Sequence, residues 1–420
     1  MEIEKKSAYS WEDYVVQPWI HFFFTINGPT AGYDLPLRVI LWNGRQIDLG
    51  NFEKPKLTIR VNSWRGLWVL LRPNLNAIGE AYMNEQIDID GELEDVVRIG
   101  CELVQQLNPT ESKFEKYLRY FNHSRLFDQQ SVRFHYDLSN DFYRLWLDEH
   151  MVYSCAYFEN GTETLGEAQL KKVDHILNKI QLKPSMTLLE IGCGWGTAVI
   201  RAAQKYGARC VGVTISQAQY DLAVQRVKDA GLQDRVKIYL QDYRDVEGQF
   251  DRVISIGMYE HVGHQHLVDY FKKLNSLLKP DGFALNHGLN SRTDTGFSGG
   301  TEFVQRYIFP GSYLPALGEA VQACEDGGFE ILDIENLRKH YTLTMTNWAK
   351  NFEKQSSKIR EMIGEAKYRA YRLYLGASVQ SFVTNNVTVQ QFLIHKSGRH
   401  PDKMPKNRRF IYQDIIGEQV

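Results

Sequence analysis

Residues 188–199 of the chain read Leu-Leu-Glu-Ile-Gly-Cys-Gly-Trp-Gly-Thr-Ala-Val. The apolar run at 187–191 predicts a buried strand, the glycines at 192, 194 and 196 predict a sharp turn, and the apolar residues after them predict a helix. Glycines let the backbone approach a ligand closely, and the start of a helix offers free amide donors. We therefore expect a small polar ligand to bind at this strand–turn–helix unit.

The second strand distinguishes between the cofactors that bind such a turn. A dinucleotide site normally carries Asp or Glu about 20 residues further on, at the end of the second strand. Residues 209–216, RCVGVTIS, contain no acidic residue, and the glycine spacing is GxGxG followed by Thr197 instead of GxGxxG. Both observations count against NAD. The pattern resembles that of S-adenosylmethionine-dependent methyltransferases.

The segments on either side alternate between strand-like and helix-like patterns. We expect strands at 187–191, 209–216, 236–240, 250–256 and 283–289, helices at 217–230 and 348–375, and a tight turn at 279–282. This alternation predicts an α/β fold, a Rossmann-like domain with a doubly wound sheet that binds its ligands at the carboxyl ends of the strands. The helices after the sheet would form a cap.

Length and composition favour a protein of two domains. The chain has 420 residues, 43% of them hydrophobic, which allows a large core. Short strand-like runs at 20–25, 37–42 and 57–61, and helical patterns at 64–71 and 93–107, predict a small α+β domain before the larger one. We place the N-terminal domain at 1–107, a polar linker at 108–131 and the larger domain at 132–420.

Charge and cysteine content exclude several classes of function. The formal net charge of -2 gives no general attraction to nucleic acid. The five cysteines are scattered without CxxC spacing, so they predict neither a disulfide framework nor a zinc site and fit a reducing cytoplasm. The N-terminus lacks a signal-peptide core, and no apolar run reaches the roughly 20 residues that span a bilayer. We expect any membrane contact to be peripheral.

Three further segments carry a more specific resemblance. They are HYDLSNDFY at 135–143, MVYSCAYF at 151–158 and FPGSYLP at 309–315. Together with LLEIGCGWGTAV, in this order and spacing, they resemble the cyclopropane-fatty-acyl-phospholipid synthase family, which includes the mycolic acid cyclopropane synthases. The resemblance covers residues 130–395 and, more loosely, the N-terminal domain, which it implies to be lipid-engaging.

The resemblance implies S-adenosylmethionine as cofactor and a set of residues that hold it. Tyr153 and Ser154 would hold its amino-acid end, and Gly192 and Gly194 would line the methionine and ribose. Four further positions complete the implied set, with Thr214 and Gln219 in place of the usual acidic residue and Asp242 and Tyr243 beside the adenine.

The chemistry of the family requires a base as well. A sulfonium methyl attacked by an alkene leaves a carbocation-like centre, and ring closure then removes a proton from the new methyl group. The resemblance implies that bound bicarbonate is this base. Its implied cage consists of Cys155, Glu260, His287, Leu289 and Tyr341, with Cys155 and Leu289 acting through backbone groups.

Each of these residues has a plainer interpretation when taken alone. Glu260 with the nearby histidines at 261, 264 and 266 could form a metal cluster, although no HExxH spacing is present and we expect no metal. His287 and Tyr341 fit a packed core, Cys155 fits a small buried residue, and the hydroxyl of Thr214 fits a strand end bonded to backbone. Only their joint occurrence in the family's order favours the functional interpretation.

The resulting expectation is an enzyme, a cyclopropane-fatty-acyl-phospholipid synthase. It would transfer a methylene unit from S-adenosylmethionine to a cis double bond in the unsaturated acyl chain of a membrane phospholipid. Two alternatives stay open: a fatty-acyl C-methyltransferase that leaves a methyl or methylene branch, and a lipid-binding protein without turnover.

The expected partners are phospholipid acyl chains at the inner face of the membrane, with no nucleic acid, in a cytoplasmic and peripherally associated protein. A homodimer is left open. The C-terminal helices would cover the acyl channel, and the basic segment 396–409 would either touch anionic headgroups or be solvated.

Overall fold

The computed structural model describes residues 35–71, 74–107, 138–292, 301–398 and 404–412. Two sequence expectations, the strand at 20–25 and the linker at 108–131, lie outside these residues. The chain divides into two compact units. Of the described residues, the first unit holds 35–107, 301–303 and 365–377, and the second holds the remainder.

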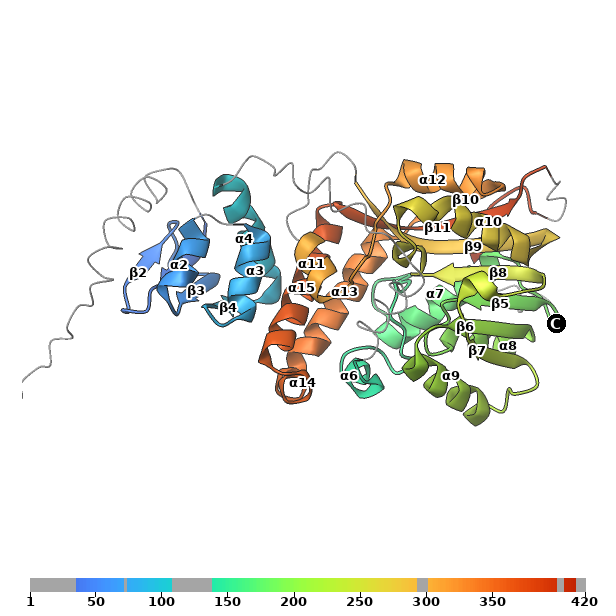
Figure 1. Ribbon diagram of the computed structural model, residues 1–420, viewed down its shortest axis with the longest axis horizontal. Coiled ribbons are helices and arrows are strands. Elements are labelled where there is room, and N and C mark those ends of the chain that lie inside the picture. The colour runs from blue at the N-terminus through green and yellow to red at the C-terminus, as the bar shows by residue number, and fades with distance from the viewer. Residues whose placement is uncertain (1–34, 72–73, 108–137, 293–300, 399–403, 413–420) are drawn as a thin grey trace, which may run out of the picture. The chain divides into compact units, whose positions relative to one another are not determined.

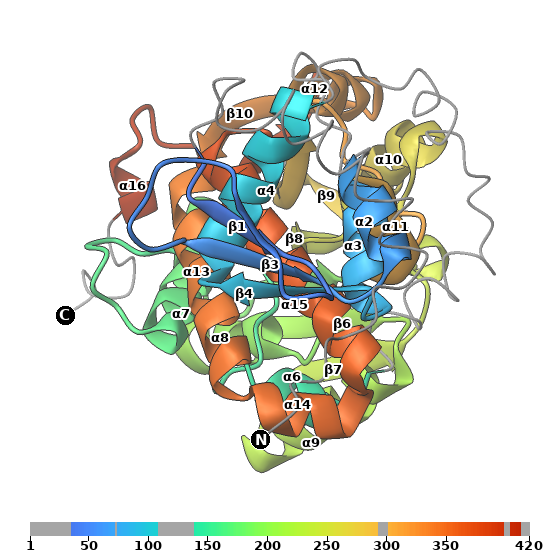
Figure 2. The same cartoon turned by 90° about the vertical axis from the view of Figure 1, so that its left-hand side faces the viewer.

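The first unit is a small α+β fold around a four-stranded sheet of order β2-β1-β3-β4 (Figure 2). Its strands are β1 (Leu37–Ile40), β2 (Gln46–Asp48), β3 (Leu57–Val61) and β4 (Ile87–Gly91), and its helices are α2 (Trp64–Leu71), α3 (Leu75–Met83) and α4 (Leu93–Leu107). Alternate residues of β1, β3 and β4 are buried, because successive side chains of a strand point to opposite faces. The predicted α+β fold of this unit is thus confirmed.

This unit also includes part of a distant helix, which the expected boundaries at 1–107 did not contain. In α15 (Glu365–Val383), Leu373 packs against the core of the first unit. Arg369 donates to the carbonyl of Tyr82, and Arg372 donates to the Tyr82 hydroxyl. Such long-range contacts leave no signal in local sequence.

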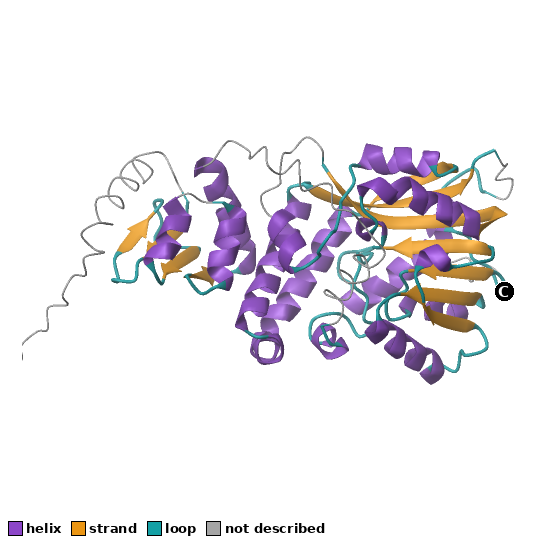
Figure 3. Ribbon diagram, viewed as in Figure 1, coloured by secondary structure: helices purple, strands orange, loops and turns teal. Residues whose placement is uncertain are grey.

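The second unit is built on a seven-stranded sheet of order β10-β11-β9-β8-β5-β6-β7, with helices on both faces (Figures 1 and 3). Its strands are β5 (Thr187–Ile191), β6 (Arg209–Thr214), β7 (Val236–Leu240), β8 (Phe250–Ile256), β9 (Leu278–Ser291), β10 (Phe329–Asn336) and β11 (Val387–Lys396). Strands β5 to β9 pair in parallel, whereas β11 pairs antiparallel with both β9 and β10. The predicted doubly wound sheet is confirmed.

Two separate cores cover the two faces of this sheet. On β5, Leu188 joins a core with α7 (Leu165–Lys179), α8 (Thr197–Tyr206) and α9 (Gln217–Asp229), whereas Leu189 joins a core with α10 (Leu267–Leu277) and α12 (Leu317–Asp326). The same alternation divides Leu393 from Phe392 on β11. This pattern explains why the central strands are nearly continuous apolar runs.

The expected tight turn at 279–282 is wrong. Strand β9 begins at Leu278 and continues without interruption to Ser291. Its pairing with β8 shifts register between Phe250 and Arg252, and Lys279 donates to the Asp251 carboxylate at 2.9 Å. A proline is tolerated at such an irregular position of a strand, so Pro280 does not require a turn here.

After the sheet, the helical stretch expected at 348–375 consists of three helices, α13 (Arg338–Lys354), α14 (Ser356–Ile363) and α15. The basic segment near the C-terminus is partly ordered against the second unit. Met404 and Phe410 pack against one of its cores, and Arg408 forms an ion pair with Asp333. Residues 405–409 are exposed, so the expectation that this segment is solvated or touches headgroups stays a prediction.

Candidate active site

The glycine turn after β5 forms one end of a pocket. Gly192, Gly194 and Gly196 have positive φ angles of 74°, 53° and 81°, and α8 begins directly after them at Thr197. A side chain at Gly192 would place its Cβ only 3.3 Å from Met258. All three positions favour glycine for backbone conformation, and Gly192 favours it for close packing as well.

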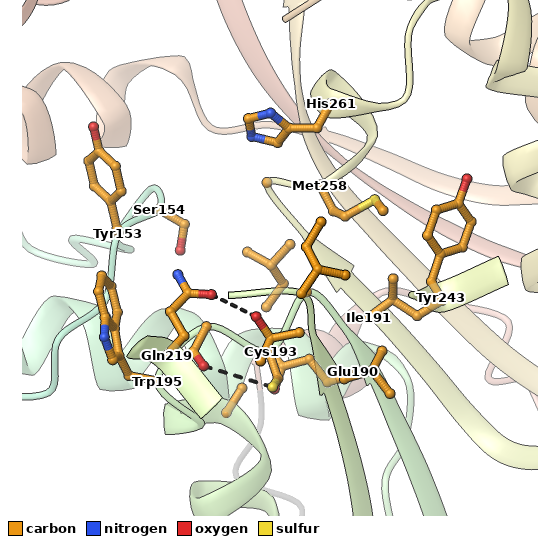
Figure 4. A pocket seen from close by; sticks show the side chains of 18 of the residues that line it. Tyr153, Ser154, Glu190, Ile191, Cys193, Trp195, Gln219, Tyr243, Met258 and His261 are labelled. Atoms are coloured by element: carbon orange, nitrogen blue, oxygen red, sulfur yellow. Dashed lines mark hydrogen bonds between the residues drawn. The ribbon is translucent and has the colours of Figure 1, made fainter. Parts of the chain in front are cut away.

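The pocket lies at the carboxyl ends of β5, β6 and β8 and collects all eight predicted cofactor residues (Figure 4). These are Tyr153, Ser154, Gly192, Gly194, Thr214, Gln219, Asp242 and Tyr243. Figure 4 shows Tyr153, Ser154 and Trp195 on one side, with Met258, His261 and Tyr243 across from them. Their contact with a cofactor remains a prediction.

Hydrogen bonds fix the polar side chains that follow β6 and β7. The Thr214 hydroxyl donates to Gln219 Oε1 at 2.8 Å and accepts from the Ser216 amide at 3.3 Å, so the expected backbone bond is also present. The Asp242 carboxylate accepts from Arg244 Nη2 at 2.7 Å. Because Gln219 Oε1 already accepts from Thr214, the side-chain NH2 group of Gln219 is the part that can donate to a ligand.

The pocket is also lined by residues to which the sequence analysis assigned no cofactor contact, and five of these bear on its chemistry. They are Lys172, Glu190, Trp195, Met258 and His261. Glu190 could have been predicted from the sequence, because an acidic residue inside the apolar run of a buried strand is unusual and indicates a functional position. Lys172 could not, since a lysine on an amphipathic helix is normally solvent-facing.

The five residues predicted to form the base site lie in a second cluster. Cys155 is buried with Leu337 and Val389, and Leu289 and Tyr341 pack against them. Glu260, in a short 3-10 helix at Tyr259–His261, accepts from the Leu289 amide at 2.7 Å. His287 lies two positions before Leu289 on β9, so the structure brings all five residues to the end of this strand.

Two polar atoms in this cluster are buried and have no hydrogen-bond partner among the described residues. They are Glu260 Oε2 and His287 Nε2. The other ring nitrogen of His287 lies 3.1 Å from Gln391 Nε2. Because an unsatisfied buried polar group is costly, these two atoms are candidate contacts for a polar ligand.

Burial changes the protonation of both groups. Loss of solvent raises the pKa of Glu260 to about 7, although the bond from the Leu289 amide opposes this shift. Burial, together with the positive charge of Lys172, lowers the pKa of His287 well below its ordinary value. At neutral pH His287 is therefore an uncharged ring, and Glu260 is close to its midpoint.

Aromatic side chains connect the pocket with the second cluster. The ring of Tyr153 lies 5.1 Å from that of Trp348 and 5.3 Å from that of Trp146. The ring of Tyr341 lies 5.9 Å from that of Trp348. The backbone adds a link, because Gly257 in the pocket donates to the His287 carbonyl at 2.8 Å.

The alternative of a metal cluster finds no support in the described part of the chain, where no three His, Cys, Asp or Glu side chains are grouped to hold an ion. The histidines near Glu260 have other partners. His264 contacts Glu319, and His266 lies 4.0 Å from Asp269.

The glycine turn, the polar side chains at the strand ends and the sheet order define the class of protein: a class I S-adenosylmethionine-dependent methyltransferase. Solved structures agree. The chain matches mycolic acid cyclopropane synthase CmaA1, complexed with SAH and CTAB, at a TM-score of 0.62 and 33% identity, over 64% of this chain and 98% of that one. Coclaurine N-methyltransferase, at 18% identity and a TM-score of 0.62, shares the fold.

Sequence relatives narrow the class. A probable fatty acid methyltransferase from Pseudomonas putida is 37% identical over 90% of this chain and 97% of its own length. Cyclopropane mycolic acid synthase 1 from Mycobacterium tuberculosis is 34% identical over 63% of this chain and 96% of its own length. The profile of mycolic acid cyclopropane synthetase matches residues 123–392, and the chain belongs to this family.

A separate profile, of a domain of unknown function, matches residues 31–107. Within the described residues, no helix is both long and apolar enough to cross a membrane.

Proposed function

We propose that this enzyme transfers a methylene unit from S-adenosylmethionine to the cis double bond of an unsaturated phospholipid acyl chain, giving a cyclopropane ring. The observation that carries the proposal is a pair of buried atoms without hydrogen-bond partners among the described residues, Glu260 Oε2 and His287 Nε2. They occur in a methyltransferase that also has a pocket for its cofactor. Ring closure requires a base that removes a proton from the new methyl group, and these two atoms supply buried polar contacts for such a base.

The pocket residues fit the cofactor. S-adenosylmethionine supplies an electrophilic methyl group on a positively charged sulfur. The turn at Gly192 and Gly194 has room for a ligand at its backbone, and a Cβ at Gly194 would meet nothing within 4 Å. Tyr153 and Ser154 would hold the amino-acid end, and Asp242 and Tyr243 would flank the adenine.

The second cluster fits a small oxyanion with a proton. Bicarbonate, when bound there, supplies the base that takes a proton from the new methyl group. The Glu260 carboxylate would accept a hydrogen bond from the hydroxyl of the anion, and His287 and Tyr341 would orient its oxygens. Cys155 and Leu289 would enclose it through backbone groups.

The aromatic side chains suit the charge that develops on the acyl chain. Aromatic faces stabilise a nearby cation by about 1–2 kcal/mol when water is excluded. Trp146, Tyr153 and Trp348 are packed around one another, and both tryptophans are fully buried. They would stabilise the carbocation-like centre between the pocket and the base site.

One second function has a specific observation in its favour. The relative from Pseudomonas putida carries the name of a fatty acid methyltransferase. A C-methyltransferase would use the same pocket and leave a methyl or methylene branch, because the outcome depends on where the base lies relative to the cation.

The proposed partners follow from the substrate. The enzyme would meet unsaturated phospholipid chains at the cytoplasmic face of a membrane, as a peripheral protein whose N-terminal domain engages lipid. No nucleic acid is proposed as a partner, and a homodimer is compatible with this function.

The variant Glu260→Gln tests whether the chain turns over or only binds lipid. We expect product formation from unsaturated vesicles to fall at least about 100-fold, in the range seen when a group that positions the base is removed. The affinity for S-adenosylhomocysteine, measured by calorimetry, should change less than about twofold. Glu247→Gln, an exposed glutamate, is the control. Unchanged product formation in Glu260→Gln would contradict the proposal.

A further inference from the structure

A lysine lies buried beneath the proposed cofactor pocket. Lys172 on α7 is 2% exposed and is one of the residues that line the pocket. Its ammonium nitrogen lies 2.7 Å from the Ser154 hydroxyl oxygen. Among the described residues no carboxylate oxygen lies within 4.0 Å of it. A buried lysine without an ion pair is uncommon and requires a reason.

The geometry fixes the role of the Ser154 hydroxyl. An ammonium group has only hydrogen-bond donors, so the serine oxygen must accept from Lys172. The hydroxyl hydrogen of Ser154 is then directed to another acceptor. A serine held in this way is a donor to its ligand, and an anionic group is the strongest acceptor it can meet.

Helix α7 holds the backbone of the same serine. Gln169, one turn before Lys172 and fully buried, donates to the Ser154 carbonyl at 2.8 Å. Residues three apart share one face of a helix. Two side chains of α7 therefore fix Ser154, one at its carbonyl and one at its hydroxyl.

Titratable groups around Lys172 come from two segments, strand β5 and the segment that carries Ser154. Glu190 on β5 lines the pocket and has its Oε2 buried without a partner among the described residues. Asp148 and Cys155 face the lysine from the segment that also carries Ser154. Burial lowers the pKa of Lys172 to about 8, while Cys155, Glu190 and Asp148 oppose the shift. A negatively charged ligand group at Ser154 would further favour the ammonium form.

We propose that Lys172 is a positioning residue for the amino-acid end of the cofactor, holding the Ser154 hydroxyl as a donor to the cofactor carboxylate. This inference rests on the proposed function of the pocket. It adds Lys172 to the residues of the cofactor site, as a cation that acts through Ser154.

The test compares two ligands that differ in the amino-acid end. S-adenosylhomocysteine carries the carboxylate, and 5′-methylthioadenosine lacks the whole amino-acid portion. We expect Lys172→Met to lower the affinity for S-adenosylhomocysteine roughly tenfold or more, as for a lost charge-assisted hydrogen bond. The affinity for 5′-methylthioadenosine should change less than about twofold. Lys171→Met, at the neighbouring and partly exposed lysine, is the matched control and should change neither affinity.

A second pair of variants isolates the route through the serine. Ser154→Ala should weaken S-adenosylhomocysteine binding, and adding Lys172→Met to it should produce little further loss. Equal losses for both ligands, or independent effects of the two substitutions, would overturn the inference and assign Lys172 a structural role.

Removal of Lys172 leaves Glu190 without its neighbouring cation, so Lys172→Met could fail to fold. The double variant Lys172→Met/Glu190→Gln, compared with Glu190→Gln alone, removes this problem and should show the same selective loss. If the unmodified chain itself does not bind S-adenosylhomocysteine, the proposed pocket is wrong and the inference falls with it.

Discussion

At the scale of single residues, Glu260 combines a functional placement with a cost in stability. Its side chain is 5% exposed, and only one of its carboxylate oxygens has a partner among the described residues. Burial raises its pKa to about 7, from 4.5. A carboxyl whose folded pKa is raised stabilises the fold at acid pH, and this contribution is lost as the pH rises from 4.5 to 7.

Glu260→Gln should therefore stabilise the protein at alkaline pH. The neutral amide keeps an oxygen for the Leu289 amide and removes a buried charge. We expect the free energy of unfolding at pH 8 to rise by about 1–3 kcal/mol, measured by denaturant titration. At pH 4.5 the gain should nearly disappear. A variant less stable than the parent at pH 8 would show that the carboxylate is well compensated.

Site residues differed in how far the sequence could predict them. The glycines and the residues at strand ends were found because their positions follow from the fold and from quoted motifs. Lys172 was not found, because its burial arises from packing between α7 and the segment at 151–155, which no local pattern encodes. Residues that belong to a motif can therefore be predicted from sequence, whereas a residue that reaches the site through packing between segments cannot.

At the scale of elements, β9 holds the base site through one glycine. A Cβ on Gly288 would lie 2.0 Å from the ring of Tyr259, which is fully buried and whose hydroxyl donates to the Leu289 carbonyl. The tyrosine immediately precedes Glu260. The absence of a side chain at Gly288 thus allows β9 and the 3-10 helix of Glu260 to lie this close together.

Gly288→Ala should disturb both the fold and the site. Overpacking of a close-packed core typically costs about 1–3 kcal/mol, and we expect a loss of this size in thermal unfolding experiments. Product formation should fall as well, because Tyr259 must move and take Glu260 with it. Gly318→Ala on α12, where a Cβ meets nothing within 4 Å, is the control and should be neutral or slightly stabilising. Parent-like stability and activity in Gly288→Ala would contradict this account.

A buried ion cluster joins α7 to β10. Glu335 lies 2.5 Å from Lys179, which is fully buried, and 2.7 Å from His175. Burial alone would raise the pKa of Glu335, but the bond from His175 and the charge of Lys179 lower it to about 2. The stability that this carboxylate contributes is present above pH 4.5 and is lost as the pH falls toward 2.

Glu335→Gln should cost about 3 kcal/mol at pH 7, because it removes the nearer carboxylate of the buried Lys179 and leaves only Asp333, at 3.8 Å. Adding Lys179→Met should restore much of this loss. Urea titrations of the two single variants and the double variant give the coupling, and the difference between Glu335→Gln and the parent should shrink below pH 4.5. Simple additivity of the two losses would show that the pair is not coupled.

At the scale of the whole molecule, the sequence predicted the central sheet well. It predicted the division of the chain into two compact units less well. Strands β5 and β8 begin and end at the predicted residues, because their central residues are buried on both faces, and the edge strand β7 does so with alternate residues buried. The prediction of a turn at 279–282 is wrong, because Pro280 and Gly282 are typical of a turn but pairing with the neighbouring strands keeps this segment extended. The contribution of α15 to the first unit depends on contacts between segments almost 300 residues apart.

The measurement that tests the central proposal most directly is mass spectrometry of phospholipid acyl chains. Purified protein is incubated with unsaturated vesicles and S-adenosylmethionine, with and without bicarbonate, and the products are then hydrogenated under mild conditions. We expect a product 14 mass units heavier than the unsaturated chain, in larger amount with bicarbonate, that takes up no hydrogen and so contains a ring. A product with the same gain that takes up hydrogen would establish the branch-forming reaction instead, and no gain at all would contradict transfer to the acyl chain.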